Sequence, residues 1–157
     1  MNYLFFVACR YSATNNSVLC LLQRLFSSAI FRYQYNMGAR IDDSSKKMKA
    51  NLTACEDEEK KPMALMSRLV WAKNINEERQ APNQILLGSD DPNYCVLLGL
   101  ASWLEFSADS GSGSPYLFAL DSNDDAVDIR RQALDIMKEV LEDPTFDFVI
   151  EPNDSGK

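Results

Sequence analysis

The residue types available for chemistry in this chain are arginine, lysine, tyrosine and paired aspartates, because histidine is absent. Without histidine, neither a Ser/His/Asp set nor a Cys/His pair can form. The sequence also lacks a G-x-x-x-x-G-K-[ST] phosphate loop and a G-x-G-x-x-G motif. Paired aspartates could bind magnesium in principle, but two of the three pairs stand at predicted helix starts, where capping explains them better. The pairs are Asp42/Asp43, Asp90/Asp91 and Asp124/Asp125. We therefore expect no metal and no cofactor.

The cysteines predict reduced thiols. None of them forms a C-x-x-C unit, and without histidine there is no Cys/His zinc set. We expect several of these thiols to be buried and the compartment to be a reducing, intracellular one. The four cysteines are Cys9, Cys20, Cys55 and Cys95.

Length and composition are those of one globular domain. The chain has 157 residues, 46% of them hydrophobic and 25% charged, which excludes wholesale disorder and a disulfide-dense mini-protein. The net charge is -7. Non-specific affinity for DNA comes mainly from lysine and arginine, so an acidic chain must concentrate its positive charge locally to bind DNA. The charge therefore argues against a free-standing DNA-binding module, but not against a fragment of a larger protein.

The first residues are apolar from 3 to 9. This run is too short to span a bilayer, and it has neither a preceding basic residue nor a clean cleavage site. We interpret it as the end of a core element and expect no membrane partner; a short secretory leader is the alternative.

A long helix is predicted from residue 18 to residue 36. Candidate N-caps precede it at 15–17, and apolar residues recur along one face at three- and four-residue spacing. Gly38 then offers a place for the helix to end. The apolar stripe consists of Val18, Leu22, Leu25, Ala29 and Tyr33.

The next part of the chain predicts a small hairpin. Residues 42–61 are polar and are interpreted as a loop, with a short helical turn around Met48 and Leu52. Alternating apolar residues predict a strand at 67–73 and a second one at Gln84–Leu87, joined by a long turn.

A second long helix is expected to begin at Asp91-Pro92, with an acidic N-cap and a proline in the first turn, and to end near Ser107. Residues 110–115 have the composition of a flexible linker, and a short apolar run comes next at 116–120.

The last predicted helix starts at a box-like pair, Ser122 with Asp125, and ends at Pro144. Residues 146–150 then alternate as a last strand. The whole is predicted to be an α+β domain, mostly helical, with a small antiparallel hairpin.

An ordered series of segments resembles the DNA tyrosine recombinases. Ala-Arg-x-x-Asp at 39–43 comes after a helix, and the family carries a similar box around its first catalytic arginine. Residues 68–82 look like the hairpin that holds the family's catalytic lysine. Residues 83–89 and 95–105 are similar to the segments beyond that hairpin in the Crypton-like recombinases of microbial eukaryotes. The likeness runs from about Ala29 to the end of the chain and is densest between 68 and 105.

The resemblance implies that Arg40 and Lys73 are site residues. These enzymes break DNA by attack of a tyrosine on a phosphate, which forms a covalent phosphotyrosine. Arg40 would clamp the charged phosphate oxygens bidentately, and Lys73 would donate a proton to the leaving oxygen. Asp43 would orient the backbone or the arginine. Taken singly, each residue is better explained as a solvated surface side chain; it is their order together that favours the family role.

The departures from the family pattern predict an inactive fragment. The family needs a His-x-x-Arg box, a later histidine or tryptophan and a nucleophilic tyrosine, and the chain reaches Lys157 about where that box would be expected. None of the six tyrosines can be assigned as the nucleophile. We expect a poorly assigned helical segment at 1–25 and a partial recombinase-like catalytic domain at 26–157. Exposed core should then cause self-association.

These expectations make DNA the ancestral partner, bound weakly by this chain, and imply a nuclear location if that role is retained. A small acidic helical protein-interaction domain is the alternative, supported by the acid excess and the amphipathic helices.

Overall fold

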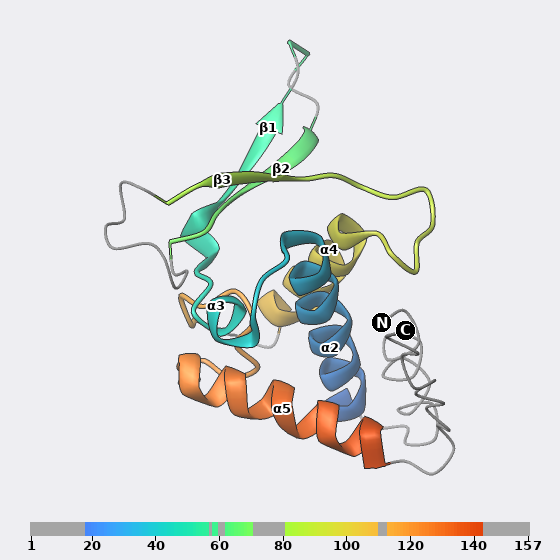
Figure 1. Cartoon of the computed structure of the whole chain (residues 1–157), viewed down its shortest axis with the longest axis vertical. Coiled ribbons are helices and arrows are strands. Elements are labelled where there is room, and N and C mark those ends of the chain that lie inside the picture. The colour runs from blue at the N-terminus through green and yellow to red at the C-terminus, as the bar shows by residue number, and fades with distance from the viewer. Residues whose placement is uncertain (1–17, 57, 60–61, 71–80, 110–112, 143–157) are drawn as a thin grey trace, which may run out of the picture.

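The computed structural model describes residues 18–56, 58–59, 62–70, 81–109 and 113–142. Within these ranges the chain is a mixed α/β fold with four α-helices and a three-stranded antiparallel sheet. Figure 1 shows the sheet at one end of the helical part and α5 (Ala126–Glu142) at the opposite end. The helices α2 (Val18–Met37) and α4 (Val96–Asp109) pack against each other between them. The predicted mixture of helices with a small antiparallel sheet is therefore confirmed.

Helix α2 forms the centre of the core. Its buried residues are spaced at helical intervals, and each is at most 6% exposed. Gly38 ends the helix with a φ of 59°, and the N–H of Ala39 donates to the carbonyl of Gln34 at 3.1 Å, which is the backbone bond of a Schellman motif. The predicted helix and its glycine stop are both confirmed. The buried stripe consists of Phe26, Ala29, Ile30, Tyr33 and Met37.

The structure of residues 42–56 differs from the prediction for residues 42–61. The predicted short helical turn around Met48 and Leu52 is confirmed as the 3-10 helix η2 (Lys49–Asn51). The remainder is not all loop, because it holds α3 (Ile41–Ser45) and strand β1 (Leu52–Glu56). Strand β1 pairs with β2 (Pro62–Arg68), and β2 pairs with β3 (Asn83–Leu86), both in antiparallel register. The five residues of β1, LTACE, do not alternate between apolar and polar, so no period-2 pattern marked this strand, and its pairing with β2 stabilises it.

The predicted hairpin is confirmed as the antiparallel pair of β2 and β3, but its first strand lies earlier in the chain. β2 runs from Pro62 to Arg68. A proline at its first position is compatible with a strand, because that residue need not donate to the ladder. Residues 71–73 of the predicted strand lie outside the described residues. Within the ladder, Leu65 is opposite Leu86 and Ser67 is opposite Gln84. Leu86 and Ser67 are buried, which places this side of the sheet against the helices.

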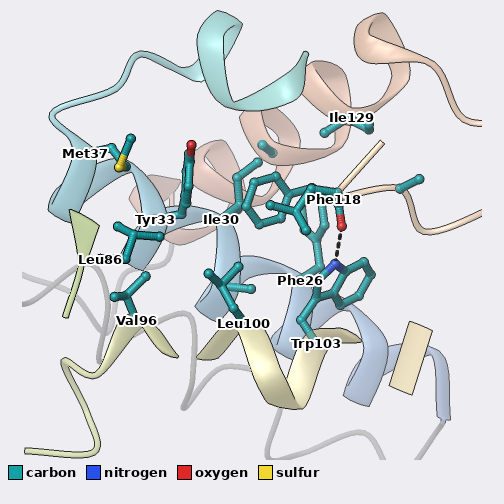
Figure 2. Close-up of a cluster of buried hydrophobic side chains, with 14 residues drawn as sticks. Phe26, Ile30, Tyr33, Met37, Leu86, Val96, Leu100, Trp103, Phe118 and Ile129 are labelled. Atoms are coloured by element: carbon teal, nitrogen blue, oxygen red, sulfur yellow. Dashed lines mark hydrogen bonds between the residues drawn. The ribbon is translucent and has the colours of Figure 1, made fainter. Parts of the chain in front are cut away.

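The core is closed by the segment 114–120, which has neither helical nor strand structure. Its Leu117 and Phe118 are fully buried, and the indole Nε1 of Trp103 donates to the carbonyl of Leu117 at 2.6 Å (Figure 2). Phe118 packs edge-on against Tyr33, and Phe26 packs edge-on against Trp103. The adjoining Ser114, predicted to lie in a flexible linker, is instead buried.

Two predicted helix starts are wrong. Asp91 accepts a hydrogen bond from the N–H of Asn93 at 2.9 Å within a turn, and α4 begins only at Val96. The N-cap of α5 is Asp125 and not Ser122, because a carboxylate oxygen of Asp125 accepts from the N–H groups of both Val127 and Asp128. The predicted stop at Pro144 and the last strand at 146–150 lie outside the described residues. None of the described helices combines the length and the apolar character needed to cross a membrane.

Candidate functional site

Arg40 is an exposed residue at the N-terminal end of α3. Its backbone N–H donates to the carboxylate of Asp43 at 3.2 Å. Its carbonyl accepts from the N–H of Ser44 at 3.0 Å and from the hydroxyl of Ser44 at 3.1 Å. The side chain of Asp43 thus orients the backbone of Arg40, one of the two roles expected for it. The backbone that carries the guanidinium is held in place while the side chain remains accessible to a ligand.

Helix α3 is also tied to α5. The guanidinium Nε of Arg130 lies 2.5 Å from a carboxylate oxygen of Asp42. Both side chains are half-exposed, so this ion pair adds little stability, but it orients the two helices.

Lys73, the second predicted site residue, lies outside the described residues. It belongs to the connection between Arg68, the last residue of β2, and Asn83, the first residue of β3. The structure therefore describes the two strands that flank this connection.

A buried polar cluster, formed by Tyr33, Lys47 and Ser67, lies where α2, α3 and the sheet meet. The hydroxyl groups of Tyr33 and Ser67 are 2.8 Å apart. The ammonium of Lys47 donates to the carbonyls of Arg68 at 2.6 Å and Asn51 at 3.3 Å, and it lies 5.9 Å from the centre of the Tyr33 ring. Lys47 is only 3% exposed.

Burial shifts the pKa of both titratable groups of this cluster. Loss of solvent raises the pKa of Tyr33 to about 12; the hydrogen bond from Ser67 opposes this, and the charge of Asp43 adds to it. Loss of solvent also lowers the pKa of Lys47 to about 8. No ion pair joins Lys47 to a carboxylate within the described part of the chain.

The buried polar cluster cannot itself meet a macromolecular substrate. The Tyr33 hydroxyl is buried and hydrogen-bonded to Ser67, so it is not exposed to an external substrate. The cluster instead connects three elements around the segment that carries Arg40. Sequence reasoning missed it, because Tyr33 was placed only in an apolar stripe and Lys47 only in a polar loop. Nothing in the sequence distinguishes Lys47 from its neighbours Lys46 and Lys49.

The thiol of Cys95 stands at the start of α4. Burial acts to raise its pKa, but backbone hydrogen bonds and the nearby Arg32 outweigh that effect, and the pKa is lowered. The N–H of Leu98 lies 3.4 Å from the sulfur, and a guanidinium nitrogen of Arg32 donates to the Cys95 carbonyl at 3.2 Å. Cys55 and Cys95 are both free thiols, as predicted.

In each aspartate pair at least one carboxylate accepts hydrogen bonds from nearby backbone N–H groups. Asp124, for example, accepts from the N–H groups of Leu120 at 3.0 Å and Asp121 at 2.9 Å. Among the residues that the structure describes, no group of three or more acidic, cysteine or histidine side chains is placed to hold a metal ion.

Comparison of the chain with models of protein families, with curated proteins and with solved structures yields no match.

Proposed function

We propose that this chain is a fragment of a Crypton-like DNA tyrosine recombinase that binds DNA through its backbone phosphates and does not cleave it. The observation that carries the proposal is the order of elements around Arg40. A long helix leads to an exposed arginine, which an acid three residues later holds in place. An antiparallel sheet comes next, and Lys73 falls in the connection between its second and third strands. This is the order in which the resemblance presents the family's first arginine and its lysine.

The chemistry of Arg40 suits a phosphate ligand. A guanidinium can donate two parallel N–H bonds to the oxygens of one phosphate, and such charge-assisted bonds are among the stronger hydrogen bonds in proteins. Because the backbone of Arg40 is held by Asp43 and Ser44, less conformational freedom is lost on binding. In an intact enzyme of this class the same group would stabilise the transition state; in this chain it would contribute to binding alone.

DNA binding is tested by fluorescence anisotropy with a labelled duplex at several salt concentrations. We expect Arg40→Ala and Lys73→Ala each to weaken binding about tenfold and to reduce the salt slope by about one. Arg131→Ala is the matched control, because it removes the same charge from an exposed position on α5 and should change affinity much less. No binding at low salt, or an equal effect of all three variants, would count against the proposal.

The absence of cleavage is tested with a suicide DNA substrate. We expect no covalent protein–DNA adduct, because the 157 residues hold no histidine and hence no His-x-x-Arg box. Detection of an adduct by denaturing electrophoresis would show that the chain is active. A DNA-binding role would place the protein in the nucleus.

A protein-interaction domain is the second candidate, and exposed apolar side chains favour it. On β3 and just after it, Ile85 is 65% exposed and Leu87 is 63% exposed, and β3 is an edge strand of the sheet. Such edges pair readily with other chains. Light scattering across a range of concentrations, combined with the DNA-binding assay, distinguishes the two candidates, because only the recombinase fragment is expected to bind DNA. Self-association that Ile85→Lys abolishes, without salt-dependent DNA binding, would favour the interaction domain.

A further inference from the structure

Lys47 stands just beyond the end of the β1–β2 ladder. The last residue pair of that ladder is Leu52 with Ser67. Asn51 and Arg68 are therefore the first residues beyond the paired part of β1 and β2. The ammonium of Lys47 donates to the carbonyls of both, at 3.3 Å to Asn51 and 2.6 Å to Arg68. One side chain thereby holds the beginning of β1 and the end of β2 together.

Space filling alone does not account for this lysine. Burying an ammonium without a carboxylate is costly, and methionine would fill a similar volume without that cost. An apolar side chain, however, could not hold two carbonyls from two strands at fixed distances. The ammonium can, because it carries several N–H donors and directs them at these two carbonyls.

The same residue is joined through its backbone to α3 and to the core. Its N–H donates to the carbonyl of Ser44 in α3 at 3.1 Å, and its carbonyl accepts from the N–H of Leu117 at 2.7 Å. Ser44 in turn bonds the carbonyl of Arg40. A short, fully hydrogen-bonded path thus leads from the end of the sheet to Arg40.

We propose that Lys47 is a positioning residue that fixes α3 against the end of the sheet and thereby places the Arg40 guanidinium for a DNA phosphate. This inference rests on the proposed DNA-binding function. Because Lys47 itself is buried, its contribution to binding passes through Arg40.

The first test compares amide hydrogen exchange in K47M and K46M. Lys46 is exposed and is the neighbouring residue, so K46M removes the same charge without touching the buried polar cluster. In K47M we expect the amides of Ser44 and Leu69 to exchange at least about tenfold faster, while that of Ile129 in α5 is unchanged. Equal acceleration at all three amides would mean that Lys47 only contributes to global stability, and it would overturn the proposal.

The second test measures whether Lys47 acts through Arg40. In the wild-type and K46M backgrounds, Arg40→Ala should weaken DNA binding about tenfold. In the K47M background, at a temperature where circular dichroism shows the variant folded, the same substitution should change affinity less than about twofold. An undiminished effect of Arg40→Ala in K47M would refute positioning. If the wild-type chain does not bind DNA, the proposed function fails, and the hydrogen-exchange test still decides whether Lys47 holds α3.

A third measurement needs no variant and covers the case in which K47M does not fold. In the wild-type chain labelled with ¹⁵N-lysine, we expect one slowly exchanging ammonium signal with a contact to the α proton of Arg68. A set of lysine signals that all exchange at the solvent-exposed rate would overturn the proposed anchor.

Discussion

Raising the pH from 8 to about 10 should stabilise this fold, and raising it further should destabilise it. The reason is that the two titratable side chains of the buried polar cluster, Lys47 and Tyr33, have pKa values shifted in opposite directions. Lys47 has its pKa lowered from 10.5 to about 8 by burial. Between these values the unfolded chain binds a proton that the folded chain has released, so the free energy of unfolding rises with pH.

The magnitude can be worked out from the two pKa values. Each pKa unit corresponds to about 1.4 kcal/mol, so Lys47 alone should add about 3 kcal/mol of stability by pH 10.5. Tyr33 acts in the other direction, because its pKa is raised from 10.0 to about 12. Above pH 10 the folded chain keeps a proton that the unfolded chain loses, and about 2 kcal/mol is lost again by pH 12. The two effects together predict a maximum of stability near pH 10.

The assay is urea unfolding at a series of pH values between 7 and 12, monitored by circular dichroism. K47M should lack the rise, and Tyr33→Phe, which keeps the ring, should lack the fall. At high pH the chain becomes more negative, and general charge repulsion also affects stability. K46M controls for this effect, and it should retain both the rise and the fall of stability with pH. A wild-type stability that does not rise between pH 8 and 10, or a rise that persists in K47M, would refute the reasoning.

Local features of the fold give three further expected outcomes. Gly38→Ala should lower the free energy of unfolding by about 1 kcal/mol in chemical denaturation, because alanine is strained at a φ of 59°. An unchanged free energy of unfolding would contradict the left-handed backbone conformation at the end of α2. Asp125→Ala should lower the free energy of unfolding by about 1 kcal/mol through loss of the α5 N-cap. Asp135→Ala, at an exposed position within the same helix, should lower it much less. Equal losses in the two variants would show that the cap is not the cause. Alkylation of Cys95, measured by peptide-resolved mass spectrometry, should show a pH midpoint below that of a free cysteine because its pKa is lowered; a midpoint at or above the free value would contradict the assigned hydrogen bonds.

The elements that could be predicted from the sequence are those specified by neighbouring residues. Helix α2 has helical periodicity and a glycine stop within its own sequence, and the helix and its stop both appear in the structure. Of the predicted stripe, Ala29 and Tyr33 are buried, whereas Leu22 and Leu25 are only partly buried. The pairing of β2 with β3 was likewise predicted from two short apolar stretches. In these cases periodicity and backbone preference act over a few residues, so no distant part of the chain is needed to specify them.

The two helix starts that were predicted wrongly depended on choices between competing local bonds. Ser122 was predicted to start the helix with Asp125 as its box partner, but the segment before α5 is closed by bonds from the Leu120 and Asp121 N–H groups to Asp124. The helix therefore begins after Asp125. Asp91 shows the same effect, since its carboxylate bonds Asn93 in a turn. Side-chain caps serve turns and helices alike, and the sequence does not distinguish the two uses.

The sequence by itself determined which chemistry is available: no histidine, an acid excess, an arginine box at 39–43 and a lysine at 73. Only the tertiary structure decided the environment of those groups. Lys46, Lys47 and Lys49 are chemically alike in the sequence, yet Lys47 alone among them is buried, between Tyr33 and the end of β2. The physical reason is that desolvation depends on which distant elements pack over a side chain. That packing is fixed by the association of α2, α3 and the sheet, and no local pattern encodes it.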